Sequence, residues 1–320
     1  MNPSQSIIAA ELRQFESLFK NAVKSNAPML DRILKYIVRT KGKQLRPMFV
    51  LLAAGVSGGI NEVTYRAASV VELLHTATLV HDDVVDEASE RRGFFSISAL
   101  WKNKASVLVG DYLLAKGLLL SLENGDFKIL EILSDAVKKM SEGELLQLEK
   151  ARLLNIRESD YFTIIQNKTA SLLASACAAG AYSARQNLEI TEKMRLFGEN
   201  TGIAFQIKDD LFDYGNEDVG KPTGNDIREK KLTLPLIFTL DQADVKTRKS
   251  LIYIIRNKYK SKADIQQVID TVKEAGGINY ASRKMEEYKN NAISILHTLD
   301  ESPERMALEE LVRYTTERRK

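Results

Sequence analysis

Residues 65–86 read YRAASVVELLHTATLVHDDVVD, an almost wholly apolar run that ends in three aspartates. Small and apolar side chains all around a helix are typical of a helix buried on most of its sides. At about 100° per residue, His75, Asp82 and Asp86 project within about 40° of one another, with Glu72 and Asp83 beside them. The stretch therefore predicts a buried helix that carries an acidic stripe toward its end.

The same acidic pattern occurs a second time, in Asp209–Asp213 (DDLFD), at the end of another apolar segment, with Gln206 one turn earlier. Carboxylates four residues apart on a helix repel each other, and burying them unpaired costs more. Ligands that are all oxygen favour a hard cation such as Mg²⁺. One DDxxD alone can be an exposed acidic helix end. Two copies, each closing a long apolar helix, predict a metal site that holds a diphosphate.

Basic residues accompany both acidic clusters. Arginine forks match phosphate oxygens bidentately, and lysine supplies a point charge. Together with the aspartates they predict a site for two diphosphates, one on metal and one on Lys and Arg alone. The basic residues are Lys41, Lys43 and Arg46 in KGKQLRP, Arg91 and Arg92, Lys168, Lys221, Lys230 and Lys231.

Apolar residues recur at three- and four-residue spacing almost throughout the chain, which indicates helices. The 320 residues include 17 glycines and 6 prolines, few for a protein of strands and turns. No stretch reads as a strand and no linker divides the chain, so we expect one all-α domain over residues 1–320. The expected helices span residues 5–24, 28–40, 45–57, 62–87, 96–121, 126–149, 159–184, 191–214, 234–256, 262–275 and 278–317.

Charge and cysteine content exclude several classes of function. The 46 basic and 43 acidic residues leave a net charge of +3, too balanced for nucleic acid to be the expected partner. The single cysteine, Cys177, excludes an internal disulfide and a cysteine-based metal cluster. No signal peptide is visible, and the apolar run Met48–Ile60 is too short to span a bilayer. We therefore expect a cytoplasmic protein with no membrane span.

From about Lys41 onward the sequence resembles the trans-isoprenyl diphosphate synthases, in particular their long-chain polyprenyl branch of octaprenyl or heptaprenyl type. The shared segments occur in the family's order and approximate spacing, a far more specific signal than one DDxxD. They are GKQLRP, ELLHTATLVHDDVVDE, RRG, GDYLLA, KTASL, FQIKDDLFDY and GKPTGNDIREKKLTLP. The resemblance implies an all-helical isoprenoid-synthase fold around a deep central cavity, assembled as a homodimer.

The resemblance also implies roles for individual residues. The Mg²⁺ ligands match Asp82, Asp86 and Asp209, with Asp83, Asp210 and Asp213 completing the two clusters and about three ions expected beside a bound diphosphate. The residues that hold the allylic diphosphate match Arg91, Lys168 and Lys231. The isopentenyl diphosphate pocket matches Gly42, Lys43, Arg46, His75 and Arg92. Thr169 and Gln206 match positions that face the developing carbocation, and Lys221 and Asp226 match a loop that closes over the metal site.

The reaction implied is chain elongation by a prenyltransferase. Mg²⁺ assists ionisation of farnesyl or geranyl diphosphate, the double bond of isopentenyl diphosphate attacks the cation, and a proton is lost in a 1′-4 condensation. Ala77 and Thr78, one turn before Asp82, are small where short-chain relatives typically carry an aromatic residue. The floor of the product tunnel then lies deeper, around Leu74 or Leu130 and Leu133. We expect all-trans products of C30 to C40 for a quinone side chain.

Other functions remain open to a sequence of this kind. A geranylgeranyl (C20) diphosphate synthase would share the chemistry, and a class I terpene cyclase would share the fold and the first aspartate motif. A cyclase does not need Lys43, Arg46 and Arg92 for a second diphosphate. A catalytically silent partner subunit tends to lose aspartates, and a calcium-binding helical protein of EF-hand type would need a D-x-D-x-D-G loop, which is absent.

Two positions depart from the family pattern. Lys230 stands where relatives often have glycine before the lysine that Lys231 matches. Phe94 and Phe95, followed by Ser96 and Ile97, replace a run that is usually polar and contains proline.

Overall fold

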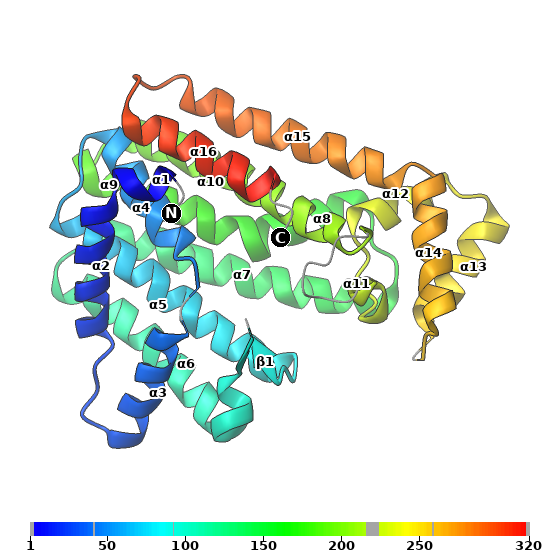
Figure 1. The fold of residues 1–320 in the computed structure, drawn as a ribbon, viewed down its shortest axis with the longest axis horizontal. Helices are drawn as coiled ribbons and strands as arrows, with labels where there is room; N and C mark the ends of the chain where they lie inside the picture. The colour runs from blue at the N-terminus through cyan, green and yellow to red at the C-terminus, as the bar shows by residue number, and fades with distance from the viewer. Residues whose placement is uncertain (1–2, 41, 92, 216–223, 258, 318–320) are drawn as a thin grey trace. The chain divides into compact units, whose positions relative to one another are not determined.

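The structure is a computed structural model that describes residues 3–40, 42–91, 93–215, 224–257 and 259–317. Nearly all of this chain is helical, which confirms the all-α class (Figure 1). The chain forms two compact units. Unit 1 comprises Met1–Val137, Ser175–Arg195 and Leu299–Leu308, and unit 2 comprises Lys138–Ala174, Leu196–Thr298 and Glu309–Lys320. The single domain expected from the sequence stays a prediction.

The helices follow one another with short connections. In chain order the elements are α1 Pro3–Ile7, α2 Ala9–Ala22, α3 Pro28–Arg39, α4 Leu45–Ser57, α5 Glu62–Val85, β1 Glu90–Arg91, β2 Phe94–Phe95, α6 Ile97–Glu123, α7 Phe127–Leu153, α8 Glu158–Ile165, the π-helical turn η1 Gln166–Ala170, α9 Ser171–Arg185, α10 Leu188–Phe212, α11 Asn225–Arg228, α12 Leu234–Gln242, α13 Val245–Arg256, α14 Lys262–Glu274, α15 Gly277–Leu296 and α16 Pro303–Glu317.

Helix α5, the helix predicted from the quoted stretch, begins at a capping box. The Asn61 side chain accepts from the Thr64 amide, and the Thr64 hydroxyl accepts from the Asn61 amide. The helix packs along α6, and glycines of α6 allow the close approach. A Cβ at Gly110 would lie 2.1 Å from Nε2 of His81. His81 therefore packs against α6, as its position away from the aspartates predicts.

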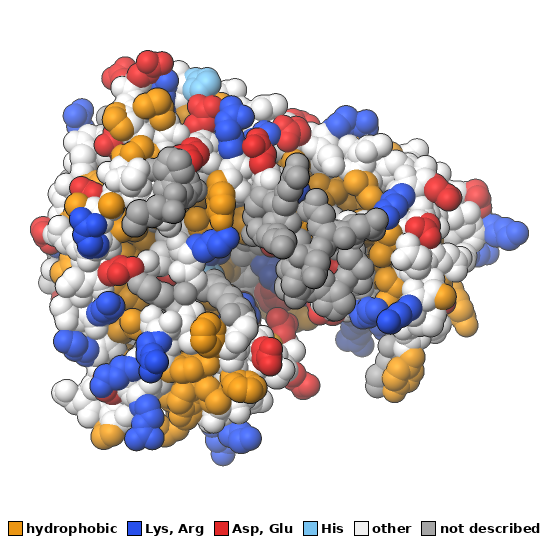
Figure 2. All heavy atoms as spheres, in the orientation of Figure 1, with side chains coloured by type: hydrophobic (Ala, Val, Ile, Leu, Met, Phe, Trp, Pro, Cys, Tyr) orange, Lys and Arg blue, Asp and Glu red, His pale blue; other side chains and the backbone are white. Residues whose placement is uncertain are grey.

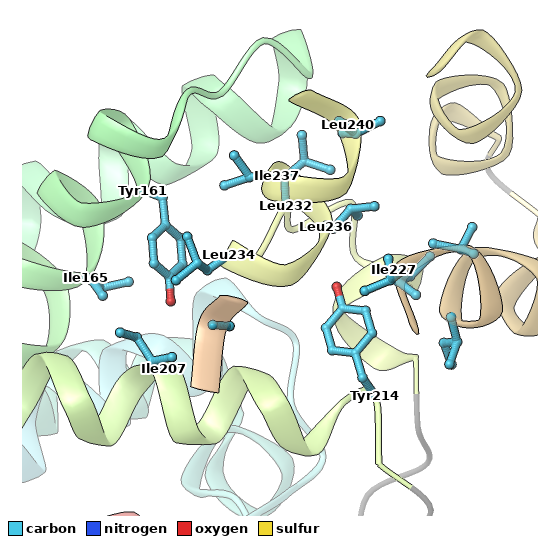
Figure 3. Packing of buried hydrophobic residues seen from close by; sticks show 14 of the residues in the cluster. Tyr161, Ile165, Ile207, Tyr214, Ile227, Leu232, Leu234, Leu236, Ile237 and Leu240 are labelled. Atoms are coloured by element: carbon cyan, nitrogen blue, oxygen red, sulfur yellow. The ribbon is translucent and has the colours of Figure 1, made fainter. Parts of the chain in front are cut away.

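Unit 2 holds an apolar core between its helices (Figure 3). Buried side chains come from α8, α10, α12, α13, α14 and α15, among them Ile165, Ile207 and Leu236. Two tyrosines, Tyr161 and Tyr214, are buried in the same core with their hydroxyls on polar partners. The core thus brings α8 against the end of α10, where the second aspartate cluster stands.

Five of the predicted helices are interrupted. Residues 234–256 form two helices because the Asp244 side chain caps α13 by accepting from the amides of Lys246 and Thr247. Residues 278–317 break before Pro303, where the Ser302 hydroxyl accepts from the Arg305 amide. Residues 159–184 contain the π turn η1. In the first two cases apolar periodicity continued across a capping signal that ends the helix. The other two interruptions lie at Ile8, between α1 and α2, and at Lys102, where φ is 72° inside α6.

A short β hairpin contradicts the expectation that the chain has no strands. Glu90 pairs with Phe95 and Arg91 with Phe94. Gly93, at φ 77°, makes the turn, and glycine adopts this conformation without steric cost. The pairing is two residues long, too short for any alternating pattern to be visible in the sequence. Figure 2 shows apolar side chains gathered over the part of unit 1 that holds α3 and this hairpin, where Phe94 and Phe95 are exposed.

Helix α6 is the single described helix that is long and apolar enough to cross a membrane. Its most apolar window has 33% of its residues buried inside the protein. Length and composition alone do not separate such a helix from a core helix, and α6 packs along α5. The absence of a membrane span stays a prediction.

Candidate active site

Unit 2 contains a cavity of about 440 Å³ at the end of α10. It combines carboxylates and lysines with apolar walls from α8. The residues in its lining that the sequence singled out are Lys168, Thr169, Gln206, Asp209, Asp210, Asp213, Asp226 and Lys231. The structure therefore brings together the second aspartate cluster, both predicted lysines of the allylic site and both positions expected to face the carbocation.

The π turn η1 carries Lys168 and Thr169 to the wall of this cavity. Glycines on two neighbouring helices give it room. A Cβ at Gly143 of α7 would lie 2.8 Å from the Lys168 backbone nitrogen, and one at Gly202 of α10 would lie 2.6 Å from the Ala170 Cα. Single π turns inside α-helices are rare and are found mostly at functional sites. Here the turn places two adjacent residues of one helix on the cavity wall.

Asp210 is held by a chain of hydrogen bonds. Tyr161 donates its hydroxyl to Asp210 Oδ2 over 2.7 Å, and Gln206 Nε2 donates to Asp210 Oδ1 over 2.8 Å. Thr169 in turn donates to Gln206 Oε1 over 2.8 Å. Burial, together with repulsion from Asp226, raises the pKa of Asp210 to about 8, whereas the two hydrogen bonds favour its ionised form. Burial also raises the pKa of Tyr161 well above its usual value, so that its hydroxyl stays a donor.

Asp213 anchors the start of α11. Its Oδ1 accepts from the Asn225 amide over 2.8 Å, and its Oδ2 accepts from the Asp226 amide over 3.2 Å. Burial raises the pKa of Asp213, and these backbone donors oppose the shift. Asp209, in contrast, is exposed where α10 meets the cavity. Of the second cluster, Asp209 is therefore the carboxylate best placed to meet a ligand from solution.

Both predicted lysines of the cavity lie beside carboxylates. Lys168 Nζ is 2.5 Å from Glu144 Oε2 and 3.3 Å from Gln147 Oε1, both on α7. Lys231 Nζ is 2.6 Å from Glu229 Oε2. The side chains of Lys168 and Lys231 are about a third exposed, and both residues line the cavity, so a ligand there can reach them. Lys230, at φ 60°, occupies a left-handed conformation that glycine would adopt without strain.

The first aspartate cluster stands at the end of α5 in unit 1. Asp83 is 3% exposed, and Arg91 Nε donates to its Oδ1 over 2.6 Å. Asp82 is half-buried, and Asp86 is the exposed C-cap residue, whose amide donates to the Asp82 carbonyl over 2.8 Å. The buried member of the cluster is thus neutralised by an arginine of β1, and the two predicted metal ligands lie nearer the surface.

Other predicted residues of unit 1 gather around a smaller cavity of about 80 Å³. Gly42, His75, Asp83 and Arg91 line it, and Arg46 Nη1 lies 2.8 Å from His75 Nε2. Lys43 is exposed. Four of the five residues predicted for isopentenyl diphosphate are described, and three of these four lie close together along α4 and α5.

The residues predicted to set chain length lie on α5. Leu74 packs toward Gly117 of α6 and is 2% exposed, and Ala77 is fully buried. Thr78 is half-buried and donates to the His75 carbonyl over 2.9 Å. None of the three belongs to the lining of the 80 Å³ cavity in the described part of unit 1. Their role in chain length stays a prediction.

The donors fit a hard metal ion in part. Among the described residues no three His, Cys, Asp or Glu side chains form a metal site by themselves. The cavity nevertheless exposes Asp209 beside further carboxylates, and a metal there would complete its shell with oxygens of a bound diphosphate. Arg92 and Lys221, which the sequence assigned to diphosphate and to the closing loop, lie outside the described residues.

Tyr161 is a functional candidate that the sequence analysis missed. It stands seven residues, or two helical turns, before Lys168, and this spacing was its available signal. Its significance comes from burial and from the hydroxyl's contact with Asp210, neither of which a sequence pattern displays.

An all-helical fold with carboxylates and lysines around an apolar-walled cavity agrees with the class of trans-prenyltransferases, enzymes that join prenyl diphosphates. The family model described as "Polyprenyl synthetase" matches residues 27–272, and the chain belongs to this family.

Individual relatives agree with that assignment. The chain is 32% identical to octaprenyl diphosphate synthase of Escherichia coli (strain K12) over 304 residues, which cover 94% of each protein. It is similar to the crystal structure of a polyprenyl synthase from Caulobacter crescentus complexed with calcium and isoprenyl diphosphate, with a TM-score of 0.91 and 34% identity, covering 100% of this chain and 98% of that one. It is also similar to a geranylgeranyl pyrophosphate synthase structure from Bacteroides thetaiotaomicron, with a TM-score of 0.84 and 38% identity over 99% of each chain.

Proposed function

We propose that this enzyme condenses isopentenyl diphosphate with an allylic diphosphate, farnesyl or geranyl diphosphate, to give an all-trans polyprenyl diphosphate of C30 to C40. The observation that carries the proposal is the 440 Å³ cavity, where Asp209, Lys168 and Lys231 meet the Thr169–Gln206 pair. Anion-binding lysines, a carboxylate for metal and oriented dipoles are what ionisation of an allylic diphosphate requires.

Binding of the allylic diphosphate falls to Lys168 and Lys231, with Arg91 from the other cluster. Lys168 and Lys231 each face a carboxylate, at 2.5 and 2.6 Å, and a diphosphate would replace that partner by more numerous oxygens of higher charge. Arg91 would keep its Nε on Asp83 and offer its other N–H groups to the diphosphate. Asp82, Asp86 and Asp209 would hold Mg²⁺, about three ions in all, and the metal would neutralise the leaving diphosphate. This exchange of partners gives diphosphate a preferred place without leaving an ammonium group buried alone.

Stabilisation of the carbocation falls to neutral dipoles. Gln206 Oε1 and the Thr169 hydroxyl oxygen both line the cavity, and neither can form a covalent bond as readily as a free carboxylate. Ile164 and Ile165 of α8 supply apolar wall next to them, which limits water near a cation that water would trap.

The acceptor diphosphate would use Gly42, Lys43, Arg46, His75 and Arg92. The attack needs no side-chain nucleophile, and the diphosphate released in the first step serves as the base for the final proton. Arg46 Nη1 lies 2.8 Å from His75 Nε2, so both side chains would bind the same phosphate group.

The length of the product is the finer part of the proposal. Small residues at Ala77 and Thr78 leave the face of α5 before Asp82 without an aromatic barrier. The similarity to an octaprenyl diphosphate synthase supports a long product for a quinone side chain. The similarity to a geranylgeranyl pyrophosphate synthase structure favours C20 as the second candidate. A homodimer, a single domain and a cytoplasmic location belong to the same proposal.

Product analysis tests the proposal. Purified protein would receive Mg²⁺, labelled isopentenyl diphosphate and farnesyl diphosphate, and the dephosphorylated alcohols would be separated by length. We expect a main product between C30 and C40. A main product of C20 would support the second candidate, and no elongation by folded protein would contradict both and return the class I terpene cyclase and silent-subunit alternatives.

A substitution on α5 separates product length from chemistry. Thr78→Phe should shorten the main product while isopentenyl diphosphate is still consumed, because an aromatic ring would block growth beside Asp82. Thr78 suits the test better than Ala77, since Ala77 is fully buried and a ring there would disturb packing. An unchanged product length would place the tunnel elsewhere.

A further inference from the structure

Tyr161 reaches the cavity wall from α8, and its ring is fixed in the core of unit 2. Its side chain is 3% exposed. Figure 3 shows the ring extending toward α10, with Ile165 and Ile207 near its hydroxyl end. A tyrosine buried in this way needs a partner for its hydroxyl, and here the partner is Asp210 Oδ2 at 2.7 Å. The aromatic packing therefore determines the direction from which Asp210 receives a hydrogen bond.

This contact determines the orientation of the Gln206 amide. With Oδ2 occupied by Tyr161, Asp210 offers Oδ1 to Gln206 Nε2 at 2.8 Å. The two donors favour the ionised form of Asp210, and a flip of the amide would turn its oxygen toward this carboxylate, which repels it. The Gln206 carbonyl oxygen is consequently held toward Thr169, on the wall of the cavity.

We propose that Tyr161 is a positioning residue for prenyl elongation: through Asp210 it holds the Gln206 carbonyl oxygen in the orientation that stabilises positive charge on the allylic carbon. The inference rests on the proposed function. Tyr161 acts through another residue, so its hydroxyl should affect the rate of ionisation more than the binding of isopentenyl diphosphate or Mg²⁺. Preorganised dipoles act where charge develops, and their misplacement lowers the rate rather than the affinity.

The test compares two tyrosines of the same core. Tyr161→Phe removes the hydroxyl on Asp210. Tyr214→Phe removes a hydroxyl that is also buried, but whose hydrogen-bond partner is Thr233 Oγ1, at 2.8 Å, in place of a carboxylate. We expect Tyr161→Phe to lower kcat roughly 10- to 100-fold. The KM for isopentenyl diphosphate in Tyr161→Phe, its Mg²⁺ requirement and the kcat of Tyr214→Phe should all stay within about twofold of wild type.

A double-mutant cycle shows whether the effect runs through Gln206. Gln206→Met keeps the length of the side chain and removes the amide. Added to Gln206→Met, the Tyr161→Phe change should lower kcat by no more than about twofold, because the oriented dipole is already gone. A full additive loss would overturn the inference, since Tyr161 would then act by another route. Thermal unfolding of each variant shows that the protein compared is folded.

Asp210→Asn provides a second variant if Tyr161→Phe does not fold. The carboxamide can accept from Tyr161 or from Gln206 but not from both in the native arrangement. If Tyr161 keeps its role as donor, the new amino group faces Gln206, whose amide would then flip. In that arrangement kcat should fall in the same range, and wild-type kcat would overturn the inference. Elongation by wild type with near-normal kcat in Tyr161→Phe overturns the inference alone. No elongation by wild type overturns the proposed function and the inference with it.

Discussion

The two aspartate clusters share a sequence pattern but not an environment. In the first, Asp83 is buried against a cation, Arg91 of β1, at 2.6 Å. In the second, the equivalent Asp210 is buried against neutral donors, Tyr161 and Gln206. A cation balances a buried carboxylate fully, whereas neutral hydrogen bonds do so in part, which agrees with the pKa of about 8 for Asp210.

This difference indicates that the second aspartate of each DDxxD motif, Asp83 or Asp210, has a structural role. Asp83 ties α5 to the hairpin that follows it, and Asp210 ties α10 to α8. The flanking residues Asp82, Asp86 and Asp209 lie nearer the surface. The family resemblance assigns these three residues to Mg²⁺, and that assignment stays a prediction.

The largest effect is expected at the exposed carboxylate of the second cluster. Asp209→Ala should lower kcat by about 10² to 10³-fold or more, because a metal at the leaving diphosphate would lose its protein ligand. Asp82→Ala should do the same in the first cluster. Asp241→Ala, an exposed aspartate of α12, is the control and should keep wild-type kcat. Steady-state kinetics at several Mg²⁺ concentrations measure the effect, and near-normal rates would refute the metal assignment.

A smaller effect, on stability, is expected from the buried pair of the first cluster. Arg91→Ala leaves Asp83 buried without its guanidinium and should lower the free energy of unfolding by about 1 to 3 kcal/mol. Arg32→Ala, an exposed arginine of α3, should change it by less than about 0.5 kcal/mol. Urea unfolding measures both.

The double variant sharpens this comparison of the clusters. Arg91→Ala leaves the negative charge of Asp83 buried without a partner, and Asp83→Asn removes that charge. The double variant should therefore be more stable than Arg91→Ala alone. If Arg91→Ala unfolds with the stability of wild type, neutralisation by Arg91 is not what keeps Asp83 buried.

The smallest effect is expected beside the second cluster. Lys230 adopts a left-handed backbone conformation, which costs any residue type other than glycine about 1 to 2 kcal/mol. Lys230→Gly removes this cost. Glycine also loses more chain entropy on folding, which costs about 0.5 to 1 kcal/mol. The net gain in the free energy of unfolding should therefore be about 0.5 to 1 kcal/mol. The kcat should not change, whereas Lys231→Ala should lower it. A loss of activity in Lys230→Gly would mean that Lys230 binds the diphosphate.

The helical class and the main site residues could be predicted because they repeat or follow a spaced motif. Apolar periodicity marked α5 and α10, and two DDxxD copies marked their ends. The breaks at Asp244 and Ser302 were missed because a cap is a local hydrogen bond inside a stretch whose apolar spacing continues. The hairpin at Glu90–Phe95 was missed because two paired residues produce no period.

The hydrogen-bond network inside the site could not be predicted from the sequence. Tyr161, Asp210 and Gln206 belong to two helices whose contact depends on packing, and a sequence without an alignment does not reveal such pairs. Asp213 likewise pairs with backbone amides of α11, which carry no residue signature. Charge and spacing identified which side chains matter, and the geometry identified which of them hold the others in place.

The π turn at Gln166–Ala170 amounts to one extra residue spliced into an otherwise ordinary helix. Deleting one residue there would let α8 run straight into α9 with regular hydrogen bonds. The deletion would also rotate the helical residues that follow it by about 100° relative to α8. Lys168 and Thr169 could then not both keep their positions on the cavity wall. The extra residue interrupts the regular hydrogen bonding of the helix, and the places of two cavity side chains depend on it.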